Sequence, residues 1–96
     1  MYKFLFNLQT QTLKIPSGPK SYSVLTEQFR TLGGIGFILD HPSDSGSPNS
    51  WIIFKVYSQK VKVIYKTDGV YYQRELFRPP GGVIEVEFSE WDRVKK

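Results

Sequence analysis

The sequence predicts an α+β domain: a mostly antiparallel, twisted sheet of about six strands, with one central helix and a short C-terminal helix. Three observations predict this class. Apolar and polar residues alternate with period two in several stretches, Asp68-Gly69 joins two of these stretches, and the period becomes helical between residues 23 and 32. A small β-barrel is the alternative architecture.

The first two predicted strands form a hairpin. Every second residue from Tyr2 to Leu8 is aromatic or leucine, which is the period of a strand with one buried face. A shorter run over residues 12–15 follows. We expect this run to end at Pro16, because proline cannot donate a hydrogen bond to a sheet.

The central helix is predicted over residues 23–32. Leu25, Phe29 and Leu32 are spaced by four and by three residues, which places them on one helical face. Gly33 and Gly34 follow, and glycine commonly supplies the left-handed residue at which a helix ends. The spacing therefore predicts that Phe29 lies in the core.

Two further strands are predicted over residues 35–39 and 51–57, on either side of a polar segment. The segment at about 40–50, DHPSDSGSPNS, contains no apolar residue other than proline, so we expect a mobile loop there. No shift in composition marks a domain boundary. The sequence therefore predicts a single domain over residues 1–96.

The strongest local signal is the hairpin turn at Asp68-Gly69. A two-residue turn fixes the register of the whole hairpin, from Thr67 opposite Val70 to Lys60 opposite Phe77. One face of this hairpin is apolar except for an arginine. The other face mixes cations, rings and an amide: Lys60, Lys62, Ile64, Lys66, Tyr71, Gln73, Glu75 and Phe77.

The chain ends with a strand predicted over residues 83–88 and a short helix capped by Ser89. Apolar residues at the inward positions of the predicted elements make up the expected core. They are Phe4, Phe6, Leu25, Phe29, Ile38, Ile53 or Phe54, Val63, Ile84 and Val86.

The mixed face of the hairpin suits single-stranded nucleic acid, since cations follow phosphates and rings stack on unpaired bases. The net charge of +4 favours a polyanionic partner. Arg74, on the apolar face, can contact phosphate or form a structural ion pair. The alternative for the whole face is a solvated surface with a Lys62–Glu75 pair. The candidate nucleic-acid-binding residues are Lys60, Lys62, Lys66, Tyr71, Arg74, Phe77 and Arg78.

Residues 74–91 resemble the single-stranded-DNA-binding domain of transcriptional coactivators of the positive-cofactor-four type. More distantly, they resemble the whirly and purine-rich-element-binding folds. The resemblance implies a curved antiparallel sheet, a dimerising helix, and basic and aromatic residues that hold an unpaired strand. The matching features are Arg74-Glu75 before Phe77, the Arg78-Pro79 turn, the alternating Ile84 and Val86, and Trp91.

Nothing in the sequence indicates an enzyme. Cysteine is absent, and the single histidine, His41, lies between Asp40 and Asp44 in the polar segment. A general base needs a rigid frame, and a metal needs more ligands than this cluster offers. We therefore expect no catalysis, no metal and no cofactor.

A protein-interaction module, such as a regulatory or accessory subunit, is the second hypothesis, because exposed aromatics and arginines are also common in protein interfaces. A homodimer is left open. No apolar stretch approaches the ~20 residues of a membrane span, so we expect no membrane partner. Without cysteine or a signal-peptide pattern, we expect a cytoplasmic protein.

Overall fold

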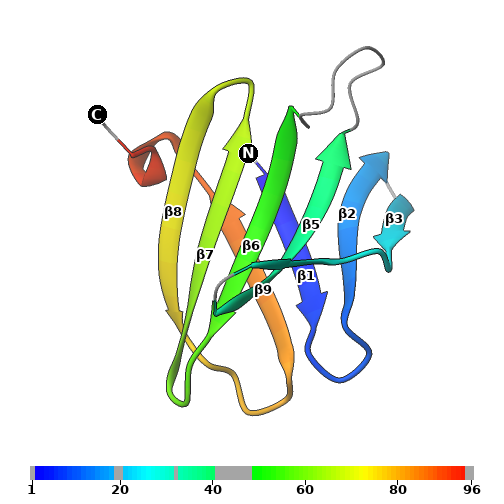
Figure 1. Cartoon of the computed structure of the whole chain (residues 1–96), viewed down its shortest axis with the longest axis vertical. Coiled ribbons are helices and arrows are strands. Elements are labelled where there is room, and N and C mark those ends of the chain that lie inside the picture. Colours follow the sequence, from blue (N-terminus) through cyan, green and yellow to red (C-terminus); the bar gives the residue numbers. More distant parts are fainter. Residues whose placement is uncertain (1, 19–20, 32, 41–48, 95–96) are drawn as a thin grey trace.

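In the computed structural model, which describes residues 2–18, 21–31, 33–40 and 49–94, the chain forms two packed antiparallel sheets (Figure 1). The four-stranded sheet has the order β3-β2-β1-β9. Its strands are β1 (Tyr2–Asn7), β2 (Thr12–Gly18), β3 (Ser21–Leu25) and β9 (Val83–Phe88). The five-stranded sheet has the order β4-β5-β6-β7-β8. Its strands are β4 (Phe29–Thr31), β5 (Gly34–Asp40), β6 (Ser50–Val56), β7 (Lys60–Thr67) and β8 (Val70–Phe77).

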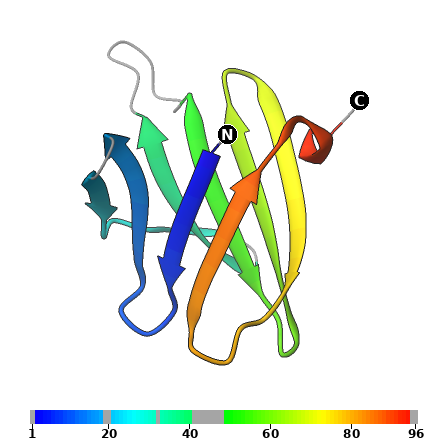
Figure 2. The same cartoon turned by 180° about the vertical axis from the view of Figure 1, so that it is seen from behind.

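The strands follow one another as a meander that changes sheet twice. Residues 26–28 lead from β3 to β4, and residues 78–82 lead from β8 back to β9. The last strand pairs with the first, from Tyr2 opposite Phe88 to Asn7 opposite Val83. Figure 2 shows β9 lying beside β1 on the back of the molecule. The α+β prediction is therefore wrong, and the fold is a small all-β structure. The alternative of a small β-barrel agrees better with the high strand content, but the hydrogen bonds define two separate sheets.

The helix predicted over residues 23–32 is replaced by β3 and β4. Three residues without regular structure separate the two strands, and they carry the chain from one sheet to the other. Leu25 consequently packs against the core from β3, whereas Phe29 lies on the outside of the five-stranded sheet, opposite Gly36. The helical spacing of these two residues arises from this crossover, not from a shared face.

The core lies between the two sheets and is built from alternate residues of the central strands. Phe6 of β1 stacks on Phe54 of β6, with ring centroids 4.5 Å apart. The expected core members Phe4, Phe6, Phe54, Val63, Ile84 and Val86 are buried. Of the alternatives Ile53 or Phe54, Phe54 is the core residue, and Ile53 lies on the opposite face of the sheet. The predictions for Phe29 and Ile38 are wrong: these residues are half-buried and also belong to the opposite face.

The hairpin at Asp68-Gly69 has the predicted register, from Thr67 opposite Val70 to Lys60 opposite Phe77. Asp68 and Gly69 both have positive φ, 50° and 78°, as the type I′ turn of a tight hairpin requires. The strand that begins at Thr12 does not stop at Pro16. It continues to Gly18 with a register shift between Pro16 and Gly18.

The C-terminal helix expected after Ser89 is a single 3-10 turn, Glu90–Asp92. The carboxylate of Asp92 accepts hydrogen bonds from the Ser89 backbone N–H and hydroxyl, at 2.9 and 3.3 Å. Beyond this turn Val94 donates its backbone N–H to Tyr71 (2.8 Å), so the tail covers one end of the β8 edge. No helix in the described part of the chain is long and apolar enough to cross a membrane.

Most of the loop predicted at about 40–50 lies outside the described residues. Asp40 ends β5, Ser50 begins β6, and the two residues are paired in the sheet.

Candidate binding face

The candidate site is the side of the five-stranded sheet that points away from the core, called here the outer face. The strand registers place its residues in rows that run across the strands. The aromatic row consists of Ile38, Trp51, Lys66 and Tyr71. The apolar row consists of Phe29, Gly36, Ile53, Ile64 and Gln73. The charged row consists of Lys55, Lys62 and Glu75.

The aromatic row brings two rings and a cation together. The rings of Trp51 and Tyr71 meet edge to face, with centroids 6.1 Å apart and planes at 71°. The ammonium of Lys66 lies over the Tyr71 ring, 5.5 Å from its centroid. All three side chains are half-buried. The neighbouring strands therefore hold these groups in place while part of each remains open to solvent.

The charged row and the end of the hairpin carry the other cations. Lys62 lies opposite Glu75, as predicted, but Glu75 forms its ion pair with Lys60, at 3.8 Å. Lys60 also lies over the ring of Tyr57, 5.4 Å from its centroid. Lys62 makes no salt bridge with any described residue. Glu75 is therefore a cross-strand neighbour of Lys62 but forms its ion pair with Lys60.

Phe77 lies opposite Lys60 at the end of β8 and is 93% exposed. An aromatic side chain this exposed contributes little to the core, and its ring is accessible to a partner. The residues predicted from the hairpin thus converge on the outer face: Lys60, Lys62, Lys66, Tyr71 and Phe77.

The two predicted arginines lie elsewhere. Arg74 faces inward opposite Val63 at the sheet edge, and its guanidinium donates a 2.7 Å hydrogen bond to the backbone oxygen of Glu87 in β9. This bond links the two sheets, which is a structural role. Arg78 follows β8 and donates to the backbone oxygen of Tyr57, at 3.2 Å. It therefore lies at one end of the molecule.

Sequence reasoning missed the contribution of β6 and of the strands beyond it. Trp51, Ile53 and Lys55 point to the outer face, while Ile52 and Phe54 are buried. The first four residues of the run WIIFKV are all apolar, so the two faces of β6 cannot be told apart by alternation of apolar and polar residues. Only the pairing of β6 with β7 reveals that Trp51 and Lys66 are neighbours.

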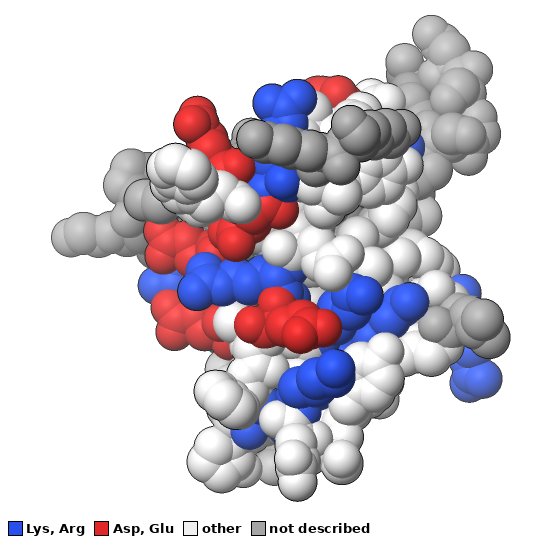
Figure 3. Space-filling view, turned by 90° about the vertical axis from the view of Figure 1, so that its left-hand side faces the viewer, with Lys and Arg blue, Asp and Glu red and all other residues white. Residues whose placement is uncertain are grey.

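Positive charge is concentrated on this face. Among the residues of its three rows and the Lys60–Phe77 pair, four are lysines, at positions 55, 60, 62 and 66, and one is acidic, Glu75. On the outside of the four-stranded sheet, Lys3 and Lys14 are balanced by Glu85 and Glu87. Figure 3 looks at the side formed by β8 and the C-terminal turn, where basic and acidic side chains alternate. Of the two sheet faces that point away from the core, the outer face of the five-stranded sheet therefore carries the larger excess of described positive charge.

Lys3 and Glu85 form a close ion pair, with 2.7 Å between the ammonium nitrogen and the carboxylate oxygen. The hydrogen bond to Glu85 and the charge of that carboxylate raise the pKa of Lys3 above its ordinary value. The two charges of this pair therefore cancel each other on the outside of the four-stranded sheet.

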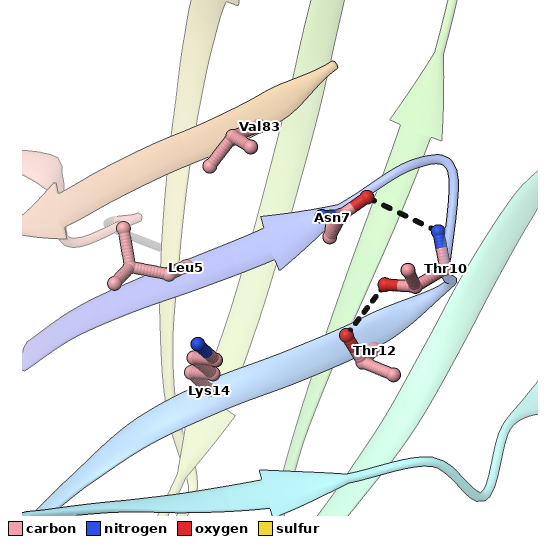
Figure 4. A pocket seen from close by; sticks show the side chains of 6 residues that line it. All are labelled: Leu5, Asn7, Thr10, Thr12, Lys14 and Val83. Carbon is pink, nitrogen blue, oxygen red and sulfur yellow. Dashed lines mark hydrogen bonds between the residues drawn. The ribbon is translucent and has the colours of Figure 1, made fainter. Parts of the chain in front are cut away.

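That face also holds a shallow pocket of about 360 Å³ near the β1–β2 turn (Figure 4). The side-chain oxygen of Asn7 accepts hydrogen bonds from the backbone N–H groups of Gln9 and Thr10, at 2.9 and 3.1 Å. The hydroxyls of Thr10 and Thr12 are 2.8 Å apart and share a hydrogen bond. These polar groups stabilise the turn by bonding to one another and to its backbone.

The described residues contain no group of three or more His, Cys, Asp or Glu side chains that could hold a metal ion. Of the cluster noted in the polar segment, His41 and Asp44 lie outside the described residues. The chain matches no family model, no curated protein and no solved structure at a significant level. The resemblance of residues 74–91 to the positive-cofactor-four type therefore rests on those residues alone.

Proposed function

We propose that this protein is a non-enzymatic module that binds single-stranded nucleic acid on the outer face of its five-stranded sheet. The observation that carries the proposal is the aromatic row, in which Lys66 lies between Trp51 and Tyr71. Phosphates require cations and unpaired bases offer flat rings for stacking, and this row presents both kinds of partner side by side.

The spacing of the row supports the proposal. Trp51 and Tyr71 lie on strands that are roughly 10 Å apart. Their rings lean toward each other, with centroids 6.1 Å apart. A short stretch of a single strand can place a base against either ring while its phosphates stay near Lys66 and Lys62. In a duplex the bases are stacked on one another, so we expect weaker binding to double-stranded nucleic acid.

The test is a fluorescence-anisotropy titration with oligo-dT and oligo-rU at low and at moderate salt. Replacement of Lys62 or Lys66 with alanine should weaken binding to both oligonucleotides and lower the salt slope by about one unit. Replacement of Trp51 or Tyr71 should cost about 1–3 kcal/mol of binding free energy and leave the salt slope almost unchanged. Lys14→Ala, on the opposite sheet, is the matched control. Absence of binding at low salt would overturn the proposal.

The apolar row favours a second candidate function. Phe29, Ile53 and Ile64 are half-buried neighbours on the outer face, and apolar side chains of this kind are typical of the centre of a protein interface. The absorbance ratio of the purified protein separates the two candidates. Nucleic acid that co-purifies and is removed by high salt supports the first, whereas a clean protein that binds no oligonucleotide supports a protein partner.

A further inference from the structure

A pocket of about 500 Å³ lies at one end of the molecule, among three connections between strands. The β1–β2 turn contributes Leu8 and Gln9, the β6–β7 turn contributes Ser58, and the segment after β8 contributes Arg78, Pro79 and Gly82. Figure 1 shows these three connections together at the lower end of the two sheets. Connections clustered at one end of a rigid sheet structure are frequent places for ligand sites.

The side chains that line this pocket are suited to an anion. Arg78 is positioned by its backbone N–H, which donates to Gln59 (3.0 Å), and by its guanidinium, which donates to Tyr57 (3.2 Å). A guanidinium has five N–H donors, and the remaining ones bond to no other described residue. The lining also includes the Ser58 hydroxyl and the Gln9 carboxamide, and none of the described lining residues is acidic.

The pocket begins where the outer face ends. Arg78 directly follows the exposed Phe77, and Lys60 lies opposite Phe77. Tyr71 and Arg78 are seven residues apart along the chain, which is roughly 24 Å at about 3.4 Å per residue of strand. A single strand of a few nucleotides can therefore start at the aromatic row and follow β7 and β8. Its end then lies at the pocket.

We propose that this pocket binds the terminal phosphate of the strand, an inference that rests on the proposed function. A terminal phosphate is a monoester, which carries about −1.5 to −2 charge at pH 7 and has three free oxygens. A phosphate inside the strand carries one charge and has two free oxygens. The terminal group therefore gains more from a guanidinium, which can bind two of its oxygens at once.

The experiment compares three oligo-dT probes of one length that carry a 5′-phosphate, a 3′-phosphate or hydroxyls at both ends. We expect a phosphate at one end to raise the affinity about tenfold, as a charge-assisted hydrogen bond would. Arg78→Ala should remove this gain. It should lower the affinity for the hydroxyl probe no more than Lys62→Ala or Lys66→Ala does. Arg78→Lys should retain part of the gain, because it keeps the charge but loses the two-pronged contact.

Two further variants keep the test independent of folding. Ser58→Ala removes a hydroxyl that bonds to no described residue, and it should reduce the gain while leaving the melting temperature unchanged. Arg30→Ala, in β4, lowers the net charge by one, as Arg78→Ala does, and should leave the gain intact. The gain should also fall below about pH 6, where the monoester dianion takes up one proton and becomes a monoanion.

The outcomes separate this inference from the proposed function. Equal affinity for all three probes would overturn the terminal-phosphate site and leave strand binding in place. Absence of binding to every probe would overturn both. Inorganic phosphate should compete only with the phosphate-dependent part of binding. If thymidine monophosphate binds in an Arg78-dependent manner while the oligonucleotides show no gain, the pocket takes a free phosphate and the strand-end assignment is wrong.

Discussion

At the scale of single residues, the outer face depends on a glycine that leaves room for a ring. The Phe29 side chain lies directly over Gly36, where a Cβ atom would overlap the ring. Gly36→Ala should therefore displace Phe29 and destabilise the protein by about 1–3 kcal/mol, as overpacking does. Chemical denaturation measures this loss.

Two variants serve as controls for this substitution. Gly81→Ala should be nearly neutral, because a Cβ atom at Gly81 would meet nothing within 4 Å. The double variant Phe29→Ala/Gly36→Ala should be less destabilised than the sum of its single changes, since removal of the ring relieves the overlap. Strict additivity would show that the two residues do not touch in solution.

The Lys3–Glu85 pair makes a prediction about pH. Because the pKa of Lys3 is raised in the folded protein, the pair stabilises the fold while Lys3 is protonated. That contribution is complete below the ordinary pKa of lysine, about 10.4, and is lost as the pH rises through the raised value. Lys3→Met should therefore lower the free energy of unfolding at neutral pH, and this difference should shrink above about pH 11.

Urea denaturation of both proteins at the two pH values provides the measurement. Lys14→Met is the matched control, because Lys14 forms no salt bridge with a described residue. A difference between wild type and Lys3→Met that is the same at both pH values would contradict the assignment.

At the scale of elements, the β7–β8 hairpin depends on its two turn residues. Gly69 has φ of +78°, a conformation in which a Cβ atom is strained. Gly69→Ala should cost about 1–2 kcal/mol of stability, whereas Gly69→Asn should cost less, since asparagine tolerates left-handed backbone. Equal losses for the two variants, measured by thermal or chemical unfolding, would indicate that the strain arises elsewhere.

Elements whose structure is set by local residues could be predicted from the sequence, and elements set by distant pairing could not. The hairpin was predictable because its information is local: Asp68-Gly69 fixes the turn, and the turn fixes every pair up to Lys60 and Phe77. The segment from β3 to β4 was not, because its short strands belong to different sheets. The spacing of Leu25 and Phe29 imitates a helix, and only pairing with distant strands shows otherwise.

At the scale of the whole molecule, the candidate site was predictable only in part. The hairpin register placed Lys60, Lys62, Lys66, Tyr71 and Phe77 on one face before the fold was known. The neighbours that complete the face come from β4, β5 and β6, and their place depends on the order of strands in the sheet. The register also places Arg74 on the apolar face, but its bond to Glu87 depends on how the two sheets meet.

The two sides of the molecule carry lysines whose effects on nucleic-acid binding can be compared. If net charge alone attracts nucleic acid, the position of a lysine is unimportant. If the outer face of the five-stranded sheet is the binding surface, Lys66 is essential and Lys14, on the other sheet, is not. Lys66→Glu and Lys14→Glu each lower the net charge from +4 to +2, so the pair separates location from total charge.

We expect Lys66→Glu to weaken the binding of oligo-dT by at least about tenfold and to lower the salt slope, because it removes a phosphate contact and adds a repulsive charge. Lys14→Glu should change the affinity only slightly, through the weak long-range field of the whole protein. Anisotropy titrations at two salt concentrations provide the comparison. Equal losses of affinity in the two variants would mean that binding depends on net charge alone. That result would contradict the assignment of the outer face as the binding surface.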